Sequence, residues 1–161
     1  MNATDEMNLF KETFDVIFQN SMDMIFLLNE EGIILDANIQ TCRTLGETLQ
    51  NIMQGNIRYY VKEKNDIGDF LEKTIQKGTE MQFFTFINND KKEISFHLSS
   101  TLVRTENFSY IVLICRDIQD LVDSAKQRKF IFELLQHDLL NKLHAEIGYI
   151  DFLNRLCTFS L

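Results

Sequence analysis

A histidine near the C-terminus has neighbours that can orient its imidazole for nucleophilic attack. Apolar residues recur every four positions, at Ile131, Leu135, Leu139 and Leu143. This spacing indicates an amphipathic helix, and at about 100° per residue it places His137 on the side that faces solvent. Asp138 follows directly, and Asn141, one turn on, shares the face of His137. A carboxylate beside an exposed imidazole can orient one ring nitrogen and leave the other as a nucleophile.

His144 offers a comparison within the same stretch. It also lies on the outer side, but Ala145 follows it and Gly148 stands one turn on. It therefore lacks both the acid and the amide. The alternative for His137 is a plain surface residue on a structural helix, because a short motif can occur without its chemistry.

Residues 137–143 read His-Asp-Leu-Leu-Asn-Lys-Leu and continue through Ile147-Gly148-Tyr149-Ile150, a pattern that resembles the H-box of sensor histidine kinases. The resemblance implies that His137 accepts phosphate from ATP and that Asp138 is the acid beside it. It also implies that Asn141 takes the place of the polar residue that positions water when such proteins dephosphorylate their partner. Lys142 stands where the family usually has proline. The partners that follow from this resemblance are a response regulator receiver domain and a histidine kinase catalytic domain.

The parts of a histidine kinase that handle ATP are missing from this sequence. It contains no N-box, no glycine-rich D-x-G-x-G loop and no P-loop. ATP can therefore act on the chain only through a catalytic domain that the sequence lacks, and whether the chain is itself an enzyme stays open. Because the sequence ends before a dimerisation hairpin could be completed, we expect residues 119–161 to hold only part of such a segment.

The stretch from Gln119 to about Phe152 predicts one long helix, because it contains a single glycine and no proline. If Ile118 is heptad position a, apolar side chains fill most a and d positions, although Arg128 and Lys142 interrupt d. Such a helix extends about 50 Å and cannot be stable alone. We therefore expect a homodimer that forms through the N- and C-terminal helices.

Upstream, hydrophobic periodicity predicts helices and strands in an α+β order. An amphipathic helix over Met7–Gln19 comes first, and a hairpin of two strands follows. A short helix over Cys42–Leu45 that ends at Gly46 comes next, followed by short helical turns with irregular backbone from Leu49 to Val61. A helix over Asn65–Lys77 then stops at Gly78. Three further strands end the region. The predicted strands are Met24–Leu28, Ile33–Leu35, Met81–Ile87, Lys92–Arg104 and Phe108–Arg116.

This region resembles a PAS domain. The resemblance rests on the segment from Asp23 to Asn38, on Gly78 before a long strand, and on the closing Arg-Asp-Ile at residues 116–118. It implies a PAS fold, in which a five-stranded antiparallel sheet carries short helices on one face, followed here by a long C-terminal dimerisation helix. The expected parts are an N-terminal amphipathic helix (1–20), a PAS sensor domain (21–118), and a signalling helix with a partial histidine-phosphotransfer dimerisation segment (119–161).

The phenylalanine-rich interior can be a filled core or can bind a small apolar ligand. The residues expected to line such a pocket are Phe26, Leu28, Phe70, Phe83, Phe86 and Ile111. We expect no metal site, since His97 lies on the polar side of its strand without a second ligand nearby in sequence. Related PAS domains hold haem through a histidine on or beside the long helix, and residues 59–78 contain none. Cys42-Arg43 matches only the middle of the flavin-binding motif, so both cofactors are disfavoured.

Composition limits the partners and the compartment. A net charge of −8 disfavours nucleic acid, whose backbone requires clustered Lys and Arg. No run of about 18 apolar residues is present, so no membrane span is expected, and the acidic N-terminus does not have the layout of a signal peptide. We therefore expect a cytoplasmic protein whose Cys42, Cys115 and Cys157 are reduced.

Three functions remain open on this basis. The first is the signal-sensing and phosphoacceptor portion of a two-component sensor histidine kinase, phosphorylated on His137 and passing phosphate to a response regulator. The second is a PAS-type dimerising or ligand-binding module without phosphotransfer. The third is a stand-alone phosphotransferase between response regulators, which would need a complete four-helix dimer core.

Overall fold

An antiparallel sheet organises the N-terminal part of the chain. The computed structural model describes residues 3–137, and the chain divides after Gln119 into two units. The elements of the first unit are α1 (Ala3–Asn20), β1 (Met24–Leu28), β2 (Ile34–Ala37), α2 (Ile39–Leu45), α3 (Leu49–Ile52), the 3-10 helix η1 (Ile57–Tyr59), α4 (Asp66–Lys77), β3 (Thr79–Ile87), β4 (Glu93–Arg104) and β5 (Ser109–Asp117). The predicted α+β order is thereby confirmed.

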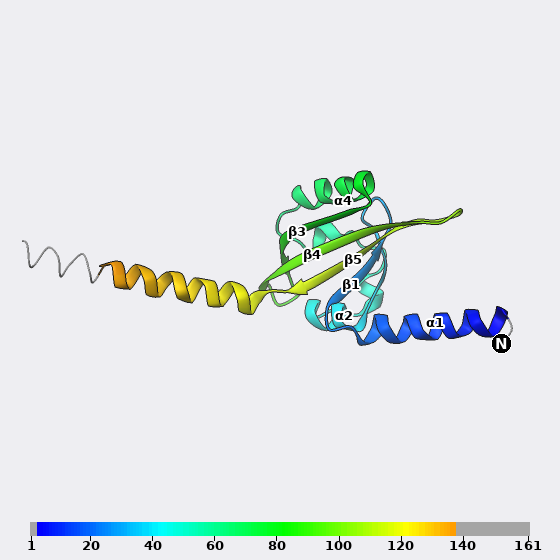
Figure 1. Ribbon diagram of the computed structural model, residues 1–161, viewed down its shortest axis with the longest axis horizontal. Coiled ribbons are helices and arrows are strands. Elements are labelled where there is room, and N and C mark those ends of the chain that lie inside the picture. The colour runs from blue at the N-terminus through cyan, green and yellow to red at the C-terminus, as the bar shows by residue number, and fades with distance from the viewer. Residues whose placement is uncertain (1–2, 138–161) are drawn as a thin grey trace, which may run out of the picture. The chain divides into compact units, whose positions relative to one another are not determined.

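The five strands lie side by side in the order β2-β1-β5-β4-β3, and each neighbouring pair is antiparallel (Figure 1). β1 and β2 form the predicted hairpin. Its turn contains Gly32 at a φ of +80°, where a Cβ would lie 2.9 Å from Cδ1 of Leu71. Glycine is therefore required there, both by the backbone conformation and by the close packing of α4.

The helix ends follow the local signals of the sequence. Asn38 caps α2 through its side chain, and Gly46 ends α2 in the left-handed conformation. Gly78 ends α4 in the same way, with a φ of +88°. The stretch from Leu49 to Val61 contains the short helices α3 and η1, which confirms the short helical turns predicted there.

One face of the sheet packs against α4 and encloses the core. Residues alternate along each strand, so every second side chain points inward. On α4, the buried positions include Ile67, Phe70, Leu71 and Thr74, which recur at helical spacing. Phe86 contacts two other rings, with centroids 6.2 Å from Phe26 and 5.3 Å from Phe96. Each such ring contributes about 1.5–3 kcal/mol by its burial.

The helix α1 differs from the other helices because its last turns pack on the opposite face of the sheet. Phe18 is only 4% exposed. A small apolar groove of about 130 Å³ separates α1 from β1 and β5, and it is lined by Phe14, Ile17, Phe18, Ile25, Leu27, Tyr110, Val112 and Ile114. The placement of helices on one face therefore does not extend to α1.

Residues 119–137 are helical, as predicted. In the second unit, two ion pairs join side chains one turn apart, Lys126 with Asp123 and Lys129 with Glu133, both at 3.9 Å. The predicted continuation of this helix to Phe152 lies outside the described residues. Within residues 3–137, no helix combines the length and the apolar character that crossing a membrane requires.

Candidate functional site

His137 is the last described residue, and its side chain is exposed on the helix of residues 119–137. Two members of the predicted apolar stripe precede it on this helix, Ile131 at 55% and Leu135 at 57% exposed. Both stripe and histidine are therefore accessible in a single copy of the chain. Asp138 and Asn141, the other two residues of the predicted phosphoacceptor site, lie outside the described residues.

The first residues after β5 are fixed to the start of β4. The amide of Ile118 donates to the carbonyl of Ser95 at 3.1 Å, and the amide of Ser95 donates to Oε1 of Gln119 at 3.0 Å. The amide of Gln119 in turn donates to Oδ1 of Asp117 at 2.7 Å. The backbone where the C-terminal helix begins is therefore held to the sheet by both main-chain and side-chain bonds.

Asn38 is a buried hub that joins α1, β1 and α2. Its Oδ1 accepts from the amides of Ile25 and Thr41 and from the hydroxyl of Thr41, at 2.8 to 3.1 Å. Its Nδ2 donates to the carbonyls of Phe18 and Asp23, at 3.1 and 3.0 Å. Asn38 is fully buried, so these bonds satisfy the amide completely and fix the end of α1 to the sheet.

Asp23 extends this network to the last strand. Its carboxylate Oδ2 lies 3.3 Å from Nη2 of Arg116 on β5, and its carbonyl accepts from Asn38. Arg116 is the arginine of the closing Arg-Asp-Ile pattern that precedes the C-terminal helix. Contacts thus run without a break from the end of α1 to the end of β5.

Five of the six residues expected to line an apolar pocket are in the buried core, namely Phe26, Leu28, Phe70, Phe86 and Ile111. The ring contacts of the core include an edge-on pair between Phe70 and Phe84, with centroids 5.4 Å apart. Phe83 must be corrected: its side chain is 66% exposed and lies on the opposite face of β3. There its ring centroid is 5.0 Å from that of His97, which takes the outer face as predicted.

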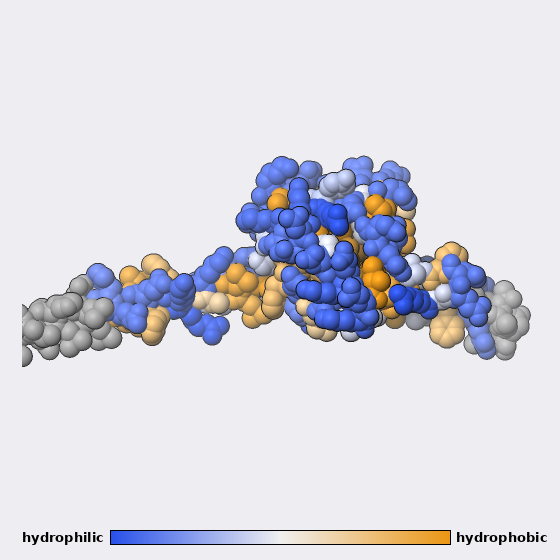
Figure 2. Space-filling view, turned by 90° about the horizontal axis from the view of Figure 1, so that it is seen from above, coloured by the Kyte–Doolittle hydropathy of each residue, from blue (hydrophilic) through white to orange (hydrophobic). Residues whose placement is uncertain are grey.

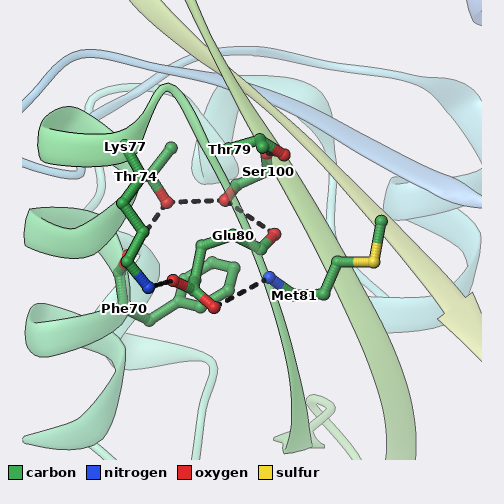
Figure 3. Close-up of polar contacts among 7 residues, drawn as sticks. All are labelled: Phe70, Thr74, Lys77, Thr79, Glu80, Met81 and Ser100. Carbon is green, nitrogen blue, oxygen red and sulfur yellow. Dashed lines mark hydrogen bonds and ion pairs between the residues drawn. The ribbon is translucent and has the colours of Figure 1, made fainter.

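A polar contact between α4 and the sheet interrupts this core. Thr74 on α4 and Ser100 on β4 are fully buried and point toward each other, with hydroxyl oxygens 2.6 Å apart (Figure 3). Oγ1 of Thr74 also lies 2.9 Å from the carbonyl of Phe70, and Oγ of Ser100 lies 3.2 Å from that of Glu80. Two hydroxyl hydrogens must serve three contacts. Either hydroxyl can donate in the contact between them, so only one of the two carbonyls receives a hydrogen at the same time.

Sequence reasoning missed a surface pocket of about 410 Å³ between the segment that follows α3 and the β3–β4 turn. Tyr60 and Glu47 line it together with three lysines, Lys62, Lys64 and Lys91. Burial, followed by the charge and the hydrogen bond of Glu47, whose Oε2 lies 3.5 Å from the Tyr60 hydroxyl, raises the pKa of Tyr60 to about 12. The residues come from separate loops, so no local pattern connects them.

The two described cysteines have the properties of buried thiols. Burial is the main cause that raises the pKa of Cys42, and it raises the pKa of the fully buried Cys115 well above the usual value. Both thiols therefore stay neutral at physiological pH. Among residues 3–137, no cluster of three or more His, Cys, Asp or Glu side chains could hold a metal ion.

Solved PAS domains have a similar fold. A PAS domain of an HTR-like protein from Haloarcula marismortui superposes with a TM-score of 0.64 at 20% identity, covering 71% of this chain and 97% of that one. A PAS domain from a two-component sensor histidine kinase gives 0.62 at 15%, covering 69% and 98%. A domain of a sensory box sensor histidine kinase/response regulator from Geobacter sulfurreducens gives 0.60 at 20%, covering 71% and 100%.

None of the curated proteins matches this sequence. The PAS domain family, in contrast, matches residues 22–120, which include all five strands and the helices α2 to α4. The chain belongs to the PAS domain family.

Proposed function

We propose that this chain is the signal-sensing and phosphoacceptor portion of a two-component sensor histidine kinase, with His137 as the phosphorylated residue. The observation that carries the proposal is the exposed position of His137 on a helix that begins directly after the last strand of the PAS domain. The H-box-like sequence that begins at His137 supports the chemistry. The fold, which is similar to PAS domains of sensor histidine kinases, supports the sensory role.

The proposed reaction needs ATP bound to a separate histidine kinase catalytic domain. A ring nitrogen of His137 attacks the γ-phosphorus, a P–N bond forms, and the P–O bond to ADP breaks. The proton on the other ring nitrogen passes to Asp138 or to water, which leaves a phosphorylated imidazole whose ring is neutral. A carboxylate oxygen of a response regulator then attacks the phosphorus, a P–O bond forms, and the P–N bond to His137 breaks. Asn141 would position water when the partner is dephosphorylated.

Exposed apolar side chains support a homodimer through the N- and C-terminal helices. On α1 they are Leu9, Phe10, Phe14, Val16 and Ile17. On residues 119–137 they are Leu121, Phe130, Ile131, Phe132, Leu134 and Leu135. Hydrophobic side chains are visible on both helices in Figure 2. A second copy would remove this surface from water, at about 25 cal/mol per Å².

The network around Asn38 supports a route for the signal. Asn38 binds α1 through the carbonyl of Phe18 and reaches Arg116 through Asp23. A change at the sheet that shifts α1 would therefore also shift the end of β5, where the C-terminal helix starts. The interrupted heptad seam allows two packings of similar energy, so a small shift can change the surroundings of His137.

Phosphate transfer to His137 is the direct test. The chain is mixed with a histidine kinase catalytic domain and ATP labelled in the γ-phosphate, and incorporation is compared between the parent, His137→Ala and His144→Ala. We expect an acid-labile label that His137→Ala abolishes and His144→Ala leaves in place. Label that survives His137→Ala would remove His137 from the mechanism.

A second function, a PAS-type dimerising module without phosphotransfer, is favoured by the same exposed apolar helices. It predicts a dimer but no acid-labile phosphate with any catalytic domain tried. The proposal of a kinase portion places the protein in the cytoplasm, where ATP and response regulators are found, and includes no contact with nucleic acid, consistent with the net charge of −8.

A further inference from the structure

The strand β3 forms one edge of the sheet, and its outward backbone groups can be identified. The pairing of β3 with β4 is unbroken from Thr79 to Ile87. At its far end, the amide of Lys62 donates to the carbonyl of Thr85, and the amide of Ile87 donates to that of Tyr60, both at 2.8 Å. The backbone amides and carbonyls of Thr85 and Ile87 therefore point away from β4. Because these backbone groups alternate in direction along a strand, those of Thr79, Met81 and Phe83 point away from β4 as well.

Two carboxylates occupy outward amides along this edge. Oε1 of Glu80 accepts from the amide of Met81 at 3.3 Å, and Oε2 of Glu63 accepts from the amide of Thr85 at 3.0 Å. Lys77, at the end of α4, holds the other oxygen of Glu80 at 2.7 Å (Figure 3). Among the described residues, no hydrogen bond reaches the amide of Phe83, between the two. Along residues 79–84, the backbone groups that point outward therefore have side chains and no neighbouring strand as cover in the described part of the chain.

Such an edge is a template for another strand. An uncovered row of amides and carbonyls pairs readily with a second chain, and exposed apolar side chains beside it add to the attraction. Met81 is 61% exposed and Phe83 is 66% exposed, both on the outer face of β3. The opposite edge of the sheet is covered by backbone instead, because Ile34 of β2 exchanges hydrogen bonds with Gln54 and Gly55.

A second copy of this chain fits the open edge by symmetry. Two identical strands in antiparallel pairing offer each other the same donors and acceptors about a two-fold axis. Thr85 and Ile87 already form backbone hydrogen bonds with Lys62 and Tyr60. The available register therefore centres on Met81, which would lie opposite Met81 of the other copy. That pairing needs the amide of Met81, which Glu80 occupies. It would also bring the two Glu80 carboxylates close together, which like charges oppose.

We propose that Glu63 and Glu80 keep the β3 edge closed against pairing with a second copy of the chain, and that their removal opens it. The hydrogen bond from Lys77, followed by that from the amide of Met81, lowers the pKa of Glu80, so its carboxylate stays charged at neutral pH. The β3 edge consists of other residues than α1 and residues 119–137, through which we propose that the functional dimer forms. Opening it would therefore join dimers into larger assemblies rather than strengthen the same dimer.

The test is the double variant Glu63→Ala/Glu80→Ala. Its control is Glu72→Ala/Glu106→Ala, which also removes two carboxylates but at positions outside β3. Sedimentation over a range of protein concentrations measures association, and hydrogen exchange measures the amides of Met81 and Phe83. We expect the first variant to associate about tenfold more tightly than the parent and to protect both amides at high concentration. The control variant should match the parent.

The variant Glu63→Gln/Glu80→Gln separates the charge from the hydrogen bond, because a glutamine oxygen still accepts from the amide. It should associate less than the alanine variant. Thermal unfolding of each variant at low concentration checks that the PAS domain stays folded. Association of the alanine variant no tighter than the parent, or equal association of the Glu72→Ala/Glu106→Ala control, would overturn the proposal.

Discussion

Arg116 and Asp23 are 93 residues apart in the sequence, yet Nη2 of Arg116 lies 3.3 Å from Oδ2 of Asp23. The pair joins the start of β1 to the end of β5, which are neighbouring strands. The arginine side chain is 71% exposed, and the aspartate side chain is 26% exposed. Solvent therefore screens the attraction, and the pair contributes little to stability. Its position at the exit of the sheet suits it better to relaying a shift than to holding the fold.

The first prediction concerns the energy of this pair. A double-mutant cycle with Asp23→Ala and Arg116→Ala, measured by urea unfolding, should give a coupling of about 0.2–1 kcal/mol that decreases in high salt. The amount of labelled phosphate on His137 should also change in Arg116→Ala, by a larger factor than a coupling energy of this size corresponds to. A coupling of several kcal/mol that salt does not reduce would mean that the pair is desolvated and structural.

The second prediction concerns Asn38. Asn38→Ala should lower the free energy of unfolding by at least about 1–3 kcal/mol, because the carbonyls of Phe18 and Asp23 and the amide of Ile25 lose buried partners together. The control is Asn107→Ala, which removes an exposed amide and should change stability by less than about 0.5 kcal/mol. Hydrogen exchange should also accelerate in the last turns of α1. Equal stability of the two variants would contradict the role of Asn38 as a hub.

The third prediction separates two adjacent phenylalanines on β3. Phe84 is 2% exposed, whereas Phe83 is 66% exposed. Phe84→Ala should cost about 3–5 kcal/mol, because it leaves a cavity beside Phe70. Phe83→Ala loses only an exposed ring contact with His97 and should cost less than about 1 kcal/mol. Urea unfolding of both variants measures the difference, and similar losses would show that the assignment of the two faces is wrong.

The same two residues show how far the sequence alone leads. Alternation predicted the strands and the outward side of His97, and glycines predicted where α2 and α4 end, because these features depend on neighbours in sequence. The interior set nevertheless included both Phe83 and Phe86, which have opposite parity on one strand. Strict use of the two-residue period would have placed Phe83 outside and chosen Phe84.

Long-range contacts could not be predicted in this way. Asn38 could be recognised as the start of a helix, but its bonds to Phe18 and Asp23 depend on how α1 returns to the sheet. The carboxylate on the amide of Thr85 comes from Glu63, 22 residues earlier, in a loop without periodicity. For the candidate site, the sequence predicted the helix and the exposure of His137, whereas Asp138 and Asn141 stay predictions.

The fourth prediction concerns Tyr60 in alkaline solution. The pKa of Tyr60 is raised from an ordinary value near 10 to about 12. An acid whose pKa is higher in the folded protein binds its proton more tightly there than in the unfolded chain. Its contribution to stability is therefore fully present below about pH 10 and is lost as the pH rises through about 12. Subtracting the absorbance titration of Tyr60→Phe from that of the parent isolates this group among the four tyrosines.

The variant Glu47→Gln distinguishes the causes of this shift. Burial is the largest cause and stays in the variant, whereas the charge of Glu47 is removed. The pKa of Tyr60 should therefore fall in Glu47→Gln but remain above its ordinary value, and the loss of stability should begin near the same pH but be complete at a lower one. Glu106→Gln, an exposed carboxylate in the β4–β5 turn, serves as the control and should leave the titration of Tyr60 unchanged. A Tyr60 titration centred at the ordinary tyrosine pKa in the folded parent would mean that the ring is solvated and that Glu47 does not contact it.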